Sequence, residues 1–418
     1  MRIIDSTDTR AVAALIDRRP RRNPALLRQV ARIVDRVRRG GDRELVALAR
    51  RLDGLREPIA VSRDEIEQGA SLVPADVRRA IRVAARNIRT VARQQLPRSW
   101  AVSPVNGVTI AQRVVPLERV GCYVPGGRYP LPSSLLMTAV PARIAGVRDI
   151  VAVCPRPAPV VMAAALEAGV TRLFRIGGAH AIAALAYGTQ TIPRVDKIVG
   201  PGNAWVAGAK ALVAADCAID FFAGPSEIAI VSSRGRASWI AADLLAQAEH
   251  DPDARAILFT PSRPLAASVA REIARQMPPG GPAKQALTRN GGIVVTRSLE
   301  EAVALVERLA PEHAVCDTPA VAGRLRRAGT VFVGSHSAQA CGDYATGSNH
   351  VLPTMGAAAS RGGLSAADFV RVATVQRISR KGLRAIAPAA IALARAEGLS
   401  AHAASIAIRL ESGRNSKS

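Results

Sequence analysis

Aromatic side chains are scarce in this chain of 418 residues, since Phe, Trp and Tyr make up only 3% of it. Ala, Val, Leu and Ile must therefore supply most of the packing. The hydrophobic fraction of 49% and the charged fraction of 22% are both near the averages of globular proteins, so the composition predicts a folded chain. A chain of this length is expected to form two or more domains.

Cysteine is also rare, and no pair has C-x-x-C spacing. An odd number of widely spaced cysteines indicates reduced thiols and a cytoplasmic location rather than a disulfide framework. The five are Cys122, Cys154, Cys217, Cys316 and Cys341. No run approaches 18 uncharged apolar residues, and the N-terminus lacks the apolar region of a signal peptide. We therefore expect no membrane association.

Lysine is nearly absent, so the formal net charge of +24 comes almost entirely from arginine. A basic surface can indicate a nucleic-acid partner. Here the arginines of segments such as 24–39 and 75–94 alternate with Ala, Leu and Val at helical spacing, as on solvated helix faces. No nucleic-acid-binding motif accompanies them. We expect no specific nucleic acid to bind, and a basic nucleic-acid-binding protein with a lapsed active site is the distant alternative.

From about residue 118, short β-branched runs alternate with Ala-rich helical stretches, and a second series of this kind follows Gly235. This alternation is typical of right-handed crossovers between parallel strands. The first hundred residues and the segment 384–411 have helical periodicity. The sequence therefore predicts an α/β protein with two parallel-sheet units of similar size and helical extensions at both ends.

Glycine-rich turns follow the predicted strands of the first unit, but none is G-x-G-x-x-G, so the common dinucleotide fingerprint is absent. The four turns are Pro125–Gly127, Gly177–Gly178, Gly200–Asn203 and Ala223–Glu227. Ligands of open α/β sheets bind outside the carboxyl ends of strands, where glycine lets backbone N–H groups approach a phosphate. Four such turns favour a ligand crevice without identifying the ligand.

Three separate segments place a histidine beside oxygen-bearing side chains. Gln247 and His250 share a face near the end of a predicted helix, Asp343 lies in an irregular segment with His350, and Glu397 precedes His402 by five residues. Such a set is compatible with a catalytic zinc site with open positions, although a structural histidine is the usual alternative for each. Glu312 and His313 adjoin where a predicted helix gives way to a strand.

At this point ten motifs together resemble the histidinol dehydrogenase family, in the family's order and across roughly residues 10–412. They are Gly121–Gly127, Ser133–Arg143, Gly177–Thr189, Val199–Asn203, Ala223–Glu227, Gln247–His250, Ala310–His313, Gly342–Asp343, Asn349–Thr354 and Glu397–His402.

The resemblance implies one Zn²⁺ per subunit, held by Gln247, His250, Asp343 and His402. The same four residues would contact the substrate, L-histidinol, together with Ser226, His313 and Glu397. NAD would lie against Tyr123, His180 and Asn203.

The implied reaction is a four-electron oxidation of L-histidinol through L-histidinal to L-histidine, the last steps of histidine biosynthesis. A histidine at the position of His313 serves the family as general base on the alcohol. A glutamate at the position of Glu312 activates the water that attacks the aldehyde. An imidazole suits reversible proton transfer near neutrality, and a neighbouring carboxylate can orient and deprotonate water.

The implied architecture is two incomplete Rossmann-like domains in an intertwined homodimer with shared active sites. The expected parts are an extension over 1–20, a discontinuous catalytic and zinc-binding domain over 21–122 and 230–364, an NAD-side domain over 123–229, and a helical segment over 365–418 that reaches the partner subunit.

Two positions depart from the family, which usually has Gln where this chain has His180 and Tyr where it has Trp205. Both lie on the expected cofactor side. The turn Gly127–Pro130 also resembles a branch that oxidises sulfonated diols, so a related zinc and NAD dehydrogenase of a small polyol is the nearer alternative.

Overall fold

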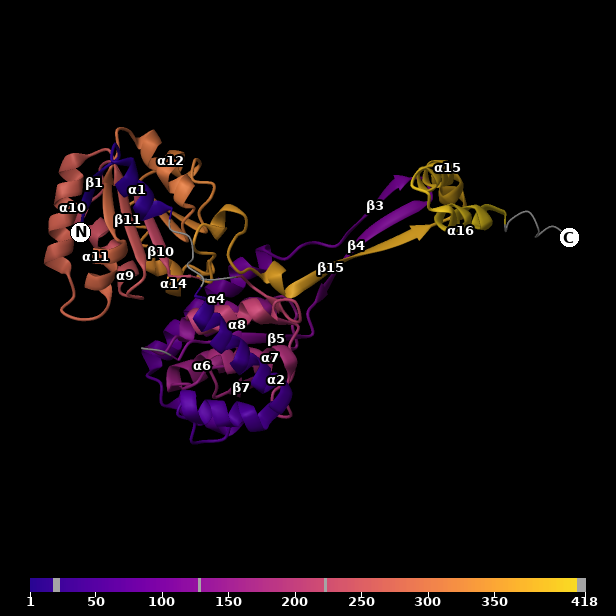
Figure 1. Cartoon of the computed structure of the whole chain (residues 1–418), viewed down its shortest axis with the longest axis horizontal. Coiled ribbons are helices and arrows are strands. Elements are labelled where there is room, and N and C mark those ends of the chain that lie inside the picture. Colours follow the sequence, from indigo (N-terminus) through magenta and orange to yellow (C-terminus); the bar gives the residue numbers. More distant parts are fainter. Residues whose placement is uncertain (18–22, 127–128, 222–223, 412–418) are drawn as a thin grey trace. The chain divides into compact units, whose positions relative to one another are not determined.

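The computed structural model describes residues 1–17, 23–126, 129–221 and 224–411. Gly127, Ala223 and the predicted boundary at residues 20–21 therefore lie outside the described residues. The chain divides into a first compact unit, Met1–Gln95 with Leu117–Phe369, and a second, Leu96–Pro116 with Val370–Ser418. The first unit contains two six-stranded sheets with helices on both faces (Figure 1).

Sheet A is entirely parallel, with the strand order β1-β12-β11-β10-β13-β14. Its strands are β1 (Ile3–Asp5), β12 (Gly292–Val295), β11 (Arg255–Thr260), β10 (Glu227–Val231), β13 (His313–Cys316) and β14 (Thr330–Val333). Successive side chains of β10 alternate between two cores, with Ile228 and Ile230 on one face and Ala229 and Val231 on the other. A strand buried on both faces must be apolar throughout, which explains its uninterrupted hydrophobic run.

Helices cover both faces of sheet A. One core includes side chains of α9 (Ala237–Ala248), α10 (Arg263–Gln276) and α11 (Ala283–Asn290), and the other includes those of α1 (Thr9–Ile16), α12 (Leu299–Leu309) and α13 (Pro319–Ala322). The short helix α14 (Ala340–Tyr344) and the 3-10 turn Ala357–Ala359 interrupt the segment expected to be irregular, 335–365, and a second 3-10 turn follows it at Ala366–Phe369.

Sheet B has the order β2-β7-β6-β5-β8-β9, and only β2 runs antiparallel to its neighbour. Its strands are β2 (Ala60–Val61), β7 (Arg172–Phe174), β6 (Asp149–Val153), β5 (Arg119–Tyr123), β8 (Lys197–Val199) and β9 (Ala218–Ile219). Its helices are α2 (Pro24–Leu52), α3 (Arg63–Ser71), α4 (Ala75–Gln94), α5 (Pro132–Ile144), α6 (Pro159–Ala168), α7 (Gly178–Tyr187) and α8 (Ala204–Val213). The α/β class with mostly parallel sheets is therefore confirmed.

The packing of the N-terminal third differs from the expected grouping of 21–122 with 230–364. Helix α2 presents Val30, Val34 and Val37 at helical spacing to the core that includes α7 and α8 of sheet B. Strand β1 instead pairs with β12, so residues 3–5 complete sheet A rather than form a separate extension. A hydrophobic stripe predicts that a helix is covered, but it does not say by which sheet.

The second unit is a three-stranded antiparallel sheet, ordered β15-β4-β3, with two helices. Its elements are β3 (Trp100–Val105), β4 (Val108–Pro116), β15 (Val370–Ile378), α15 (Arg380–Ala396) and α16 (Ser400–Glu411). Strand β15 pairs with β4 over nine residues. The C-terminal segment expected to be helical thus begins with a long strand.

Candidate active site

Glu312 and His313 lie at the amino end of β13. Helix α12 ends at Leu309, Ala310 takes a left-handed φ of 48°, and the chain enters the strand at His313. Both side chains are buried, at 5% and 4% exposure. Because β13 pairs with β10 and His313 faces Ile228, Glu312 lies beside Glu227, whose backbone N–H donates to Glu312 Oε2 at 2.9 Å.

Burial shapes the charge of this pair. Loss of hydration raises the pKa of Glu312 well above its usual value, and the neighbouring carboxylates of Glu227 and Asp343 raise it further. Burial lowers the pKa of His313 to about 4, so its ring is neutral at pH 7 and can accept a proton. His313 Nδ1 lies 3.8 Å from Glu312 Oε2 and has no hydrogen-bond partner among the described residues.

Asp343, on α14, lies between three histidines. Its carboxylate oxygens are 4.0 Å from His313 Nε2, His250 Nε2 and His350 Nδ1. His350 Nδ1 also lies 2.9 Å from the backbone carbonyl of Asp343. Gln339 donates its amide to Asp343 Oδ2 at 2.8 Å, and the same nitrogen lies 3.5 Å from His313 Nε2. The structure therefore brings Glu312, His313, Asp343 and His250 together.

These residues fit a metal ion in part. His250 follows the end of α9, and Gln247, in the last turn of that helix, has a buried Oε1 without a hydrogen-bond partner. Two atoms on one zinc ion stand about 3–4 Å apart, since each lies about 2.0–2.2 Å from it. The 4.0 Å between His250 Nε2 and Asp343 Oδ2 is close to that range. Among the described residues, no three His, Cys, Asp or Glu side chains form a complete metal cluster.

Two of the predicted zinc and substrate residues, Glu397 and His402, belong to the second unit. Glu397 caps the C-terminus of α15, and His402 lies in the first turn of α16. Both side chains are exposed.

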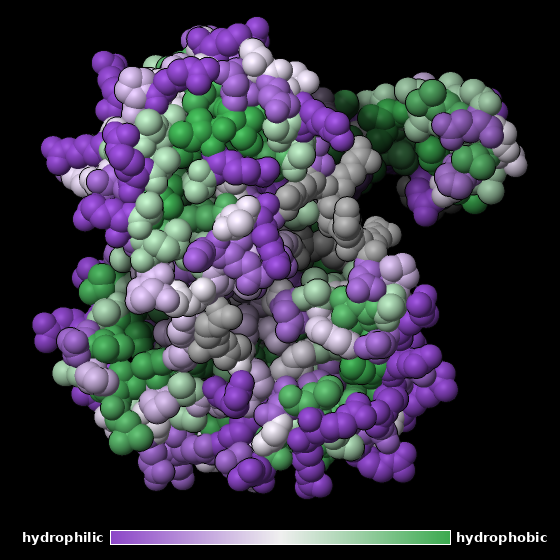
Figure 2. Space-filling model, turned by 60° about the vertical axis from the view of Figure 1, so that its left-hand side comes forward, coloured by the Kyte–Doolittle hydropathy of each residue, from purple (hydrophilic) through white to green (hydrophobic). Residues whose placement is uncertain are grey.

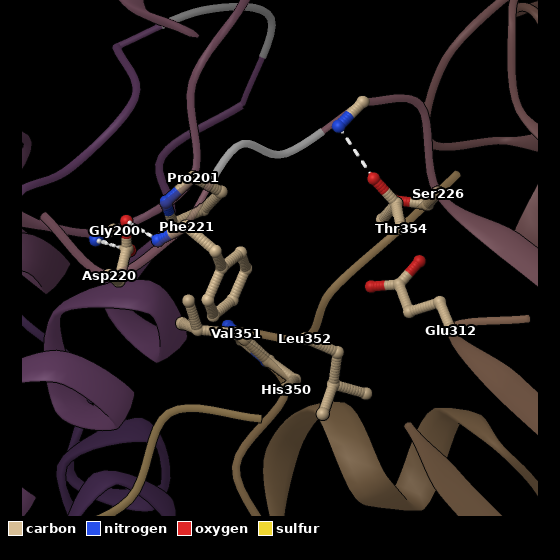
Figure 3. A pocket seen from close by; sticks show the side chains of 11 residues that line it. Gly200, Pro201, Asp220, Phe221, Ser226, Glu312, His350, Val351, Leu352 and Thr354 are labelled. Atoms are coloured by element: carbon tan, nitrogen blue, oxygen red, sulfur yellow. Dashed lines mark hydrogen bonds between the residues drawn. The ribbon is translucent and has the colours of Figure 1, made fainter. Parts of the chain in front are cut away.

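A small cavity opens beside Glu312 and Ser226 (Figure 3). Its lining comes from both sheets of the first unit, and comprises Gly200, Pro201, Asp220, Phe221, Gly224, Ser226, Glu312, His350, Val351, Leu352 and Thr354. Gly200 and Phe221 follow the carboxyl ends of β8 and β9, as expected for ligand sites of open sheets. Ser226 and Glu312 instead precede β10 and β13, so sheet A meets the cavity with the amino ends of its strands.

The residues expected to contact NAD are engaged with other protein groups. The Tyr123 hydroxyl accepts from the Gly178 N–H at 3.1 Å. His180 is 1% exposed, and its Nε2 lies 2.8 Å from Asp53 Oδ2, which also accepts from the Gly177 N–H. Asn203 caps α8 through its side-chain oxygen. The turn at Gly177–Gly178 is thus held by Asp53, a residue that the sequence did not single out.

Three further residues of the site had no assigned role in the sequence. His350 belongs to the predicted histidine segments but has no predicted function, and no sequence pattern singles out Gln339 or Glu227. Gln339 stands four residues before Asp343, a spacing that would have indicated contact if the segment had been expected to be helical. For Glu227, its place directly after Ser226 was the available signal.

The comparisons with known proteins agree with one another. The chain matches the family model described as histidinol dehydrogenase over residues 16–410. It is similar to the histidinol dehydrogenase of Caulobacter vibrioides, with 46% identity over 92% of each chain. It is also 44% identical to that of Methanothermobacter thermautotrophicus, over 97% of this chain and 99% of the relative. The crystal structure of histidinol dehydrogenase from Elizabethkingia anophelis matches with a TM-score of 0.91 and 33% identity, over 96% of each chain.

Proposed function

This chain belongs to the histidinol dehydrogenase family, and from that premise we propose that it oxidises L-histidinol to L-histidine with NAD and zinc. The observation that carries the proposal is the meeting of Glu312, His313, Asp343 and His250 beside a cavity. A general base, a water-activating carboxylate and two metal ligands are the groups that this chemistry needs.

The overall reaction balances as one alcohol, one water and two NAD⁺ giving one carboxylate, two NADH and three protons. In the first oxidation, His313 accepts the hydroxyl proton while hydride leaves the carbinol carbon. In the second, Glu312 accepts a proton from the water that attacks the aldehyde, and hydride leaves the resulting hydrate. The His313 ring is neutral and so is free to accept the first proton, and the raised pKa of Glu312 makes its ionised carboxylate a stronger base toward water.

Gln247, His250, Asp343 and His402 would hold the zinc ion. When bound, zinc would supply orientation of the substrate's nitrogen atoms and polarisation of its hydroxyl. The unpartnered Gln247 Oε1 and the neighbouring His250 and Asp343 side chains support this set. Ser226, His313 and Glu397 are proposed to contact the substrate as well. Of these, Ser226 lines the cavity with Glu312.

NAD is proposed to bind the sheet B side of the cavity. Asn203 is exposed at the N-terminus of α8, the positive end of the helix dipole, which favours an anion. Tyr123 and His180 would then act chiefly by shaping the turn at Gly177–Gly178, since both are buried and engaged with other groups. The family-based contacts at these two positions remain a prediction.

We also propose a homodimer in which Glu397 and His402 serve the partner's site. The second unit exposes many apolar side chains among the described residues, which favours burial against another copy. They include Trp100, Val102, Val372, Val375, Ile378, Leu393 and Ile408. A cytoplasmic location is supported by five cysteines that are all free thiols. Among the described residues, no helix is long and apolar enough to cross a membrane.

The test is an assay of the purified full chain with zinc, NAD and L-histidinol. We expect two NADH for each histidine formed, and a panel of small polyols and sulfonated diols as poor substrates. A Glu312→Gln variant should lose histidinal oxidation more than histidinol oxidation. No NADH from histidinol with metal restored, or a better rate on a diol, would contradict the proposal.

A further inference from the structure

Glu227 is a buried carboxylate to which the reaction above assigns no role. It begins β10 and is only 1% exposed. Its backbone N–H donates to Glu312 Oε2 at 2.9 Å, and its own Oε2 accepts from the backbone N–H of Met355 at 3.2 Å. One residue therefore connects the proposed water-activating carboxylate to the segment that forms another wall of the cavity.

The other carboxylate oxygen of Glu227 faces a buried cation. Oε1 lies 3.3 Å from Arg255 Nη1, and the Arg255 side chain is 7% exposed. Register fixes the pair, because Glu227 lies opposite Arg255 where β10 pairs with β11. The Arg255 N–H also donates to the carbonyl of Ser226 at 2.9 Å. Since burying two charges contributes little net stability, this pair suggests a role in geometry.

The wall that Glu227 holds is tightly fitted. Met355 has a φ of 57°, a conformation that a residue with a side chain adopts only when its surroundings impose it. Thr354 Oγ1 accepts from the Gly224 N–H at 2.5 Å, and Figure 3 shows this bond at the cavity with Ser226 and Glu312 nearby. A Cβ on Gly224 would stand 2.6 Å from Met355 Cγ. Small changes at Met355 would therefore move the cavity wall.

We propose that Glu227 is a positioning residue, which holds the Thr354–Met355 wall in register with the Glu312 carboxylate and so sets the efficiency of the second oxidation. Its two carboxylate oxygens have separate contacts, since Oε2 accepts from the Met355 N–H and Oε1 forms the ion pair with Arg255. The inference rests on the proposed function, because it assigns water activation to Glu312.

The test is Glu227→Gln in the full chain, with histidinol and histidinal oxidation measured separately. An amide offers only one acceptor oxygen, and the charged Arg255 takes it because charge-assisted contacts are stronger. The Met355 N–H then loses its partner. We expect kcat for histidinal to fall by about tenfold to a hundredfold, as misplacement of reacting groups does, with a smaller fall for histidinol.

Two variants separate positioning from simple destabilisation. Glu227→Gln with Arg255→Met frees the amide oxygen for Met355, and should restore most of the ratio of the two rates. Asp149→Asn removes an ion pair with Arg119 in sheet B, which shares no residue with this contact network, and should leave the ratio unchanged. If Glu227→Gln leaves the ratio of the histidinal rate to the histidinol rate unchanged, whether or not both rates fall, the proposal is overturned.

Hydrogen exchange gives a readout that does not depend on activity. The backbone amide of Met355 should exchange about tenfold faster in Glu227→Gln, since its acceptor is lost. Unchanged exchange would also overturn the proposal. A wild-type chain that oxidises neither compound would instead refute the proposed function, while faster exchange at Met355 would still support the positioning role of Glu227.

Discussion

The two parallel sheets of the first unit meet the cavity through opposite ends of their strands. Sheet A presents amino ends, where Glu312 and Ser226 precede β13 and β10. Sheet B presents carboxyl ends, where Gly200 and Phe221 follow β8 and β9. The expectation that ligands bind outside the carboxyl ends of strands therefore holds for sheet B but not for sheet A.

Hydrogen bonding differs between these two edges. Four buried side-chain atoms on the sheet A side have no hydrogen-bond partner in the described part of the chain, against one on the sheet B side, His180 Nδ1. The four are Glu227 Oε1, Gln247 Oε1, His313 Nδ1 and Gln339 Oε1. On the sheet B side, the Asp220 carboxylate binds Lys210 and accepts from the N–H groups of Gly200 and Phe221. Buried polar atoms without partners are uncommon, and their concentration around Glu312 and His313 favours the proposal that the chemistry lies on the sheet A side and that sheet B supports it.

His313→Gln should have the largest effect, and it tests whether the chemistry depends on the sheet A side. An amide of similar size cannot serve as a base, and loss of general base catalysis lowers kcat by about 10²–10⁴-fold. We expect a thermal midpoint near that of the wild type, because the polar group and its volume are mostly retained. Steady-state NADH formation and a melting curve check both, and a kcat within a few-fold of wild type would contradict the role of His313.

His402→Ala tests whether the second unit completes the metal set. Removing a residue that only hydrogen-bonds to a metal ligand lowers metal affinity by roughly 10–100-fold. Removing one of the four ligands themselves should lower zinc affinity by more than that. Turnover should nearly vanish at limiting zinc. Elemental analysis after dialysis measures the metal directly, and His336→Ala is a matched control on an exposed histidine of the first unit. Equal zinc content in the His402 and His336 variants would refute the ligand set.

Lys210→Met tests the supporting side. Lys210 and Asp220 are each 3% exposed, so removing the cation leaves a buried carboxylate uncompensated, at a cost of about 3–5 kcal/mol in the free energy of unfolding. We expect a lower urea midpoint, but a kcat per folded molecule within a few-fold of wild type. In Lys210→Met with Asp220→Asn, stability should partly return. A kcat as low as that of His313→Gln would place chemistry on sheet B.

The sequence predicted the elements of the α/β core well because each is marked locally. The change from helix to strand expected at Glu312 and His313 is observed there, between α12 (Leu299–Leu309) and β13 (His313–Cys316). Their patterns of apolar spacing are clear, and serine and proline mark their ends. Strand β15 was not predicted, although its residues alternate, because the segment that follows it, 384–411, has clear helical periodicity. Strand β1 has only three residues, too few to show a period.

The candidate site was predictable as residue types but not as contacts. The family resemblance named Glu312, His313 and Asp343. In the structure, the His313 ring lies 3.8 Å from the Glu312 carboxylate and 4.0 Å from the Asp343 carboxylate. The Glu227 side chain accepts a hydrogen bond from Met355, which is 128 residues away in the sequence. The Gln339 side chain donates one to Asp343 within the short helix segment. Asp53 reaches His180 from a segment 127 residues away. Long-range pairing of this kind depends on tertiary packing, which no local pattern encodes.

The positive surface charge outside the site should have the smallest effect, which we expect to be weak binding to DNA. Hydrophilic side chains cover much of the face in Figure 2, and several arginines of the Arg-rich helices are paired, as in Arg36 with Glu44 and Arg89 with Glu167. We expect weak, sequence-independent binding to duplex DNA that falls by about 10³-fold or more between about 50 and 200 mM salt. Fluorescence anisotropy with two unrelated duplexes measures it. A preference for one duplex that persists at the higher salt would show that the positive charge serves a specific partner, because counterion release alone gives no such preference.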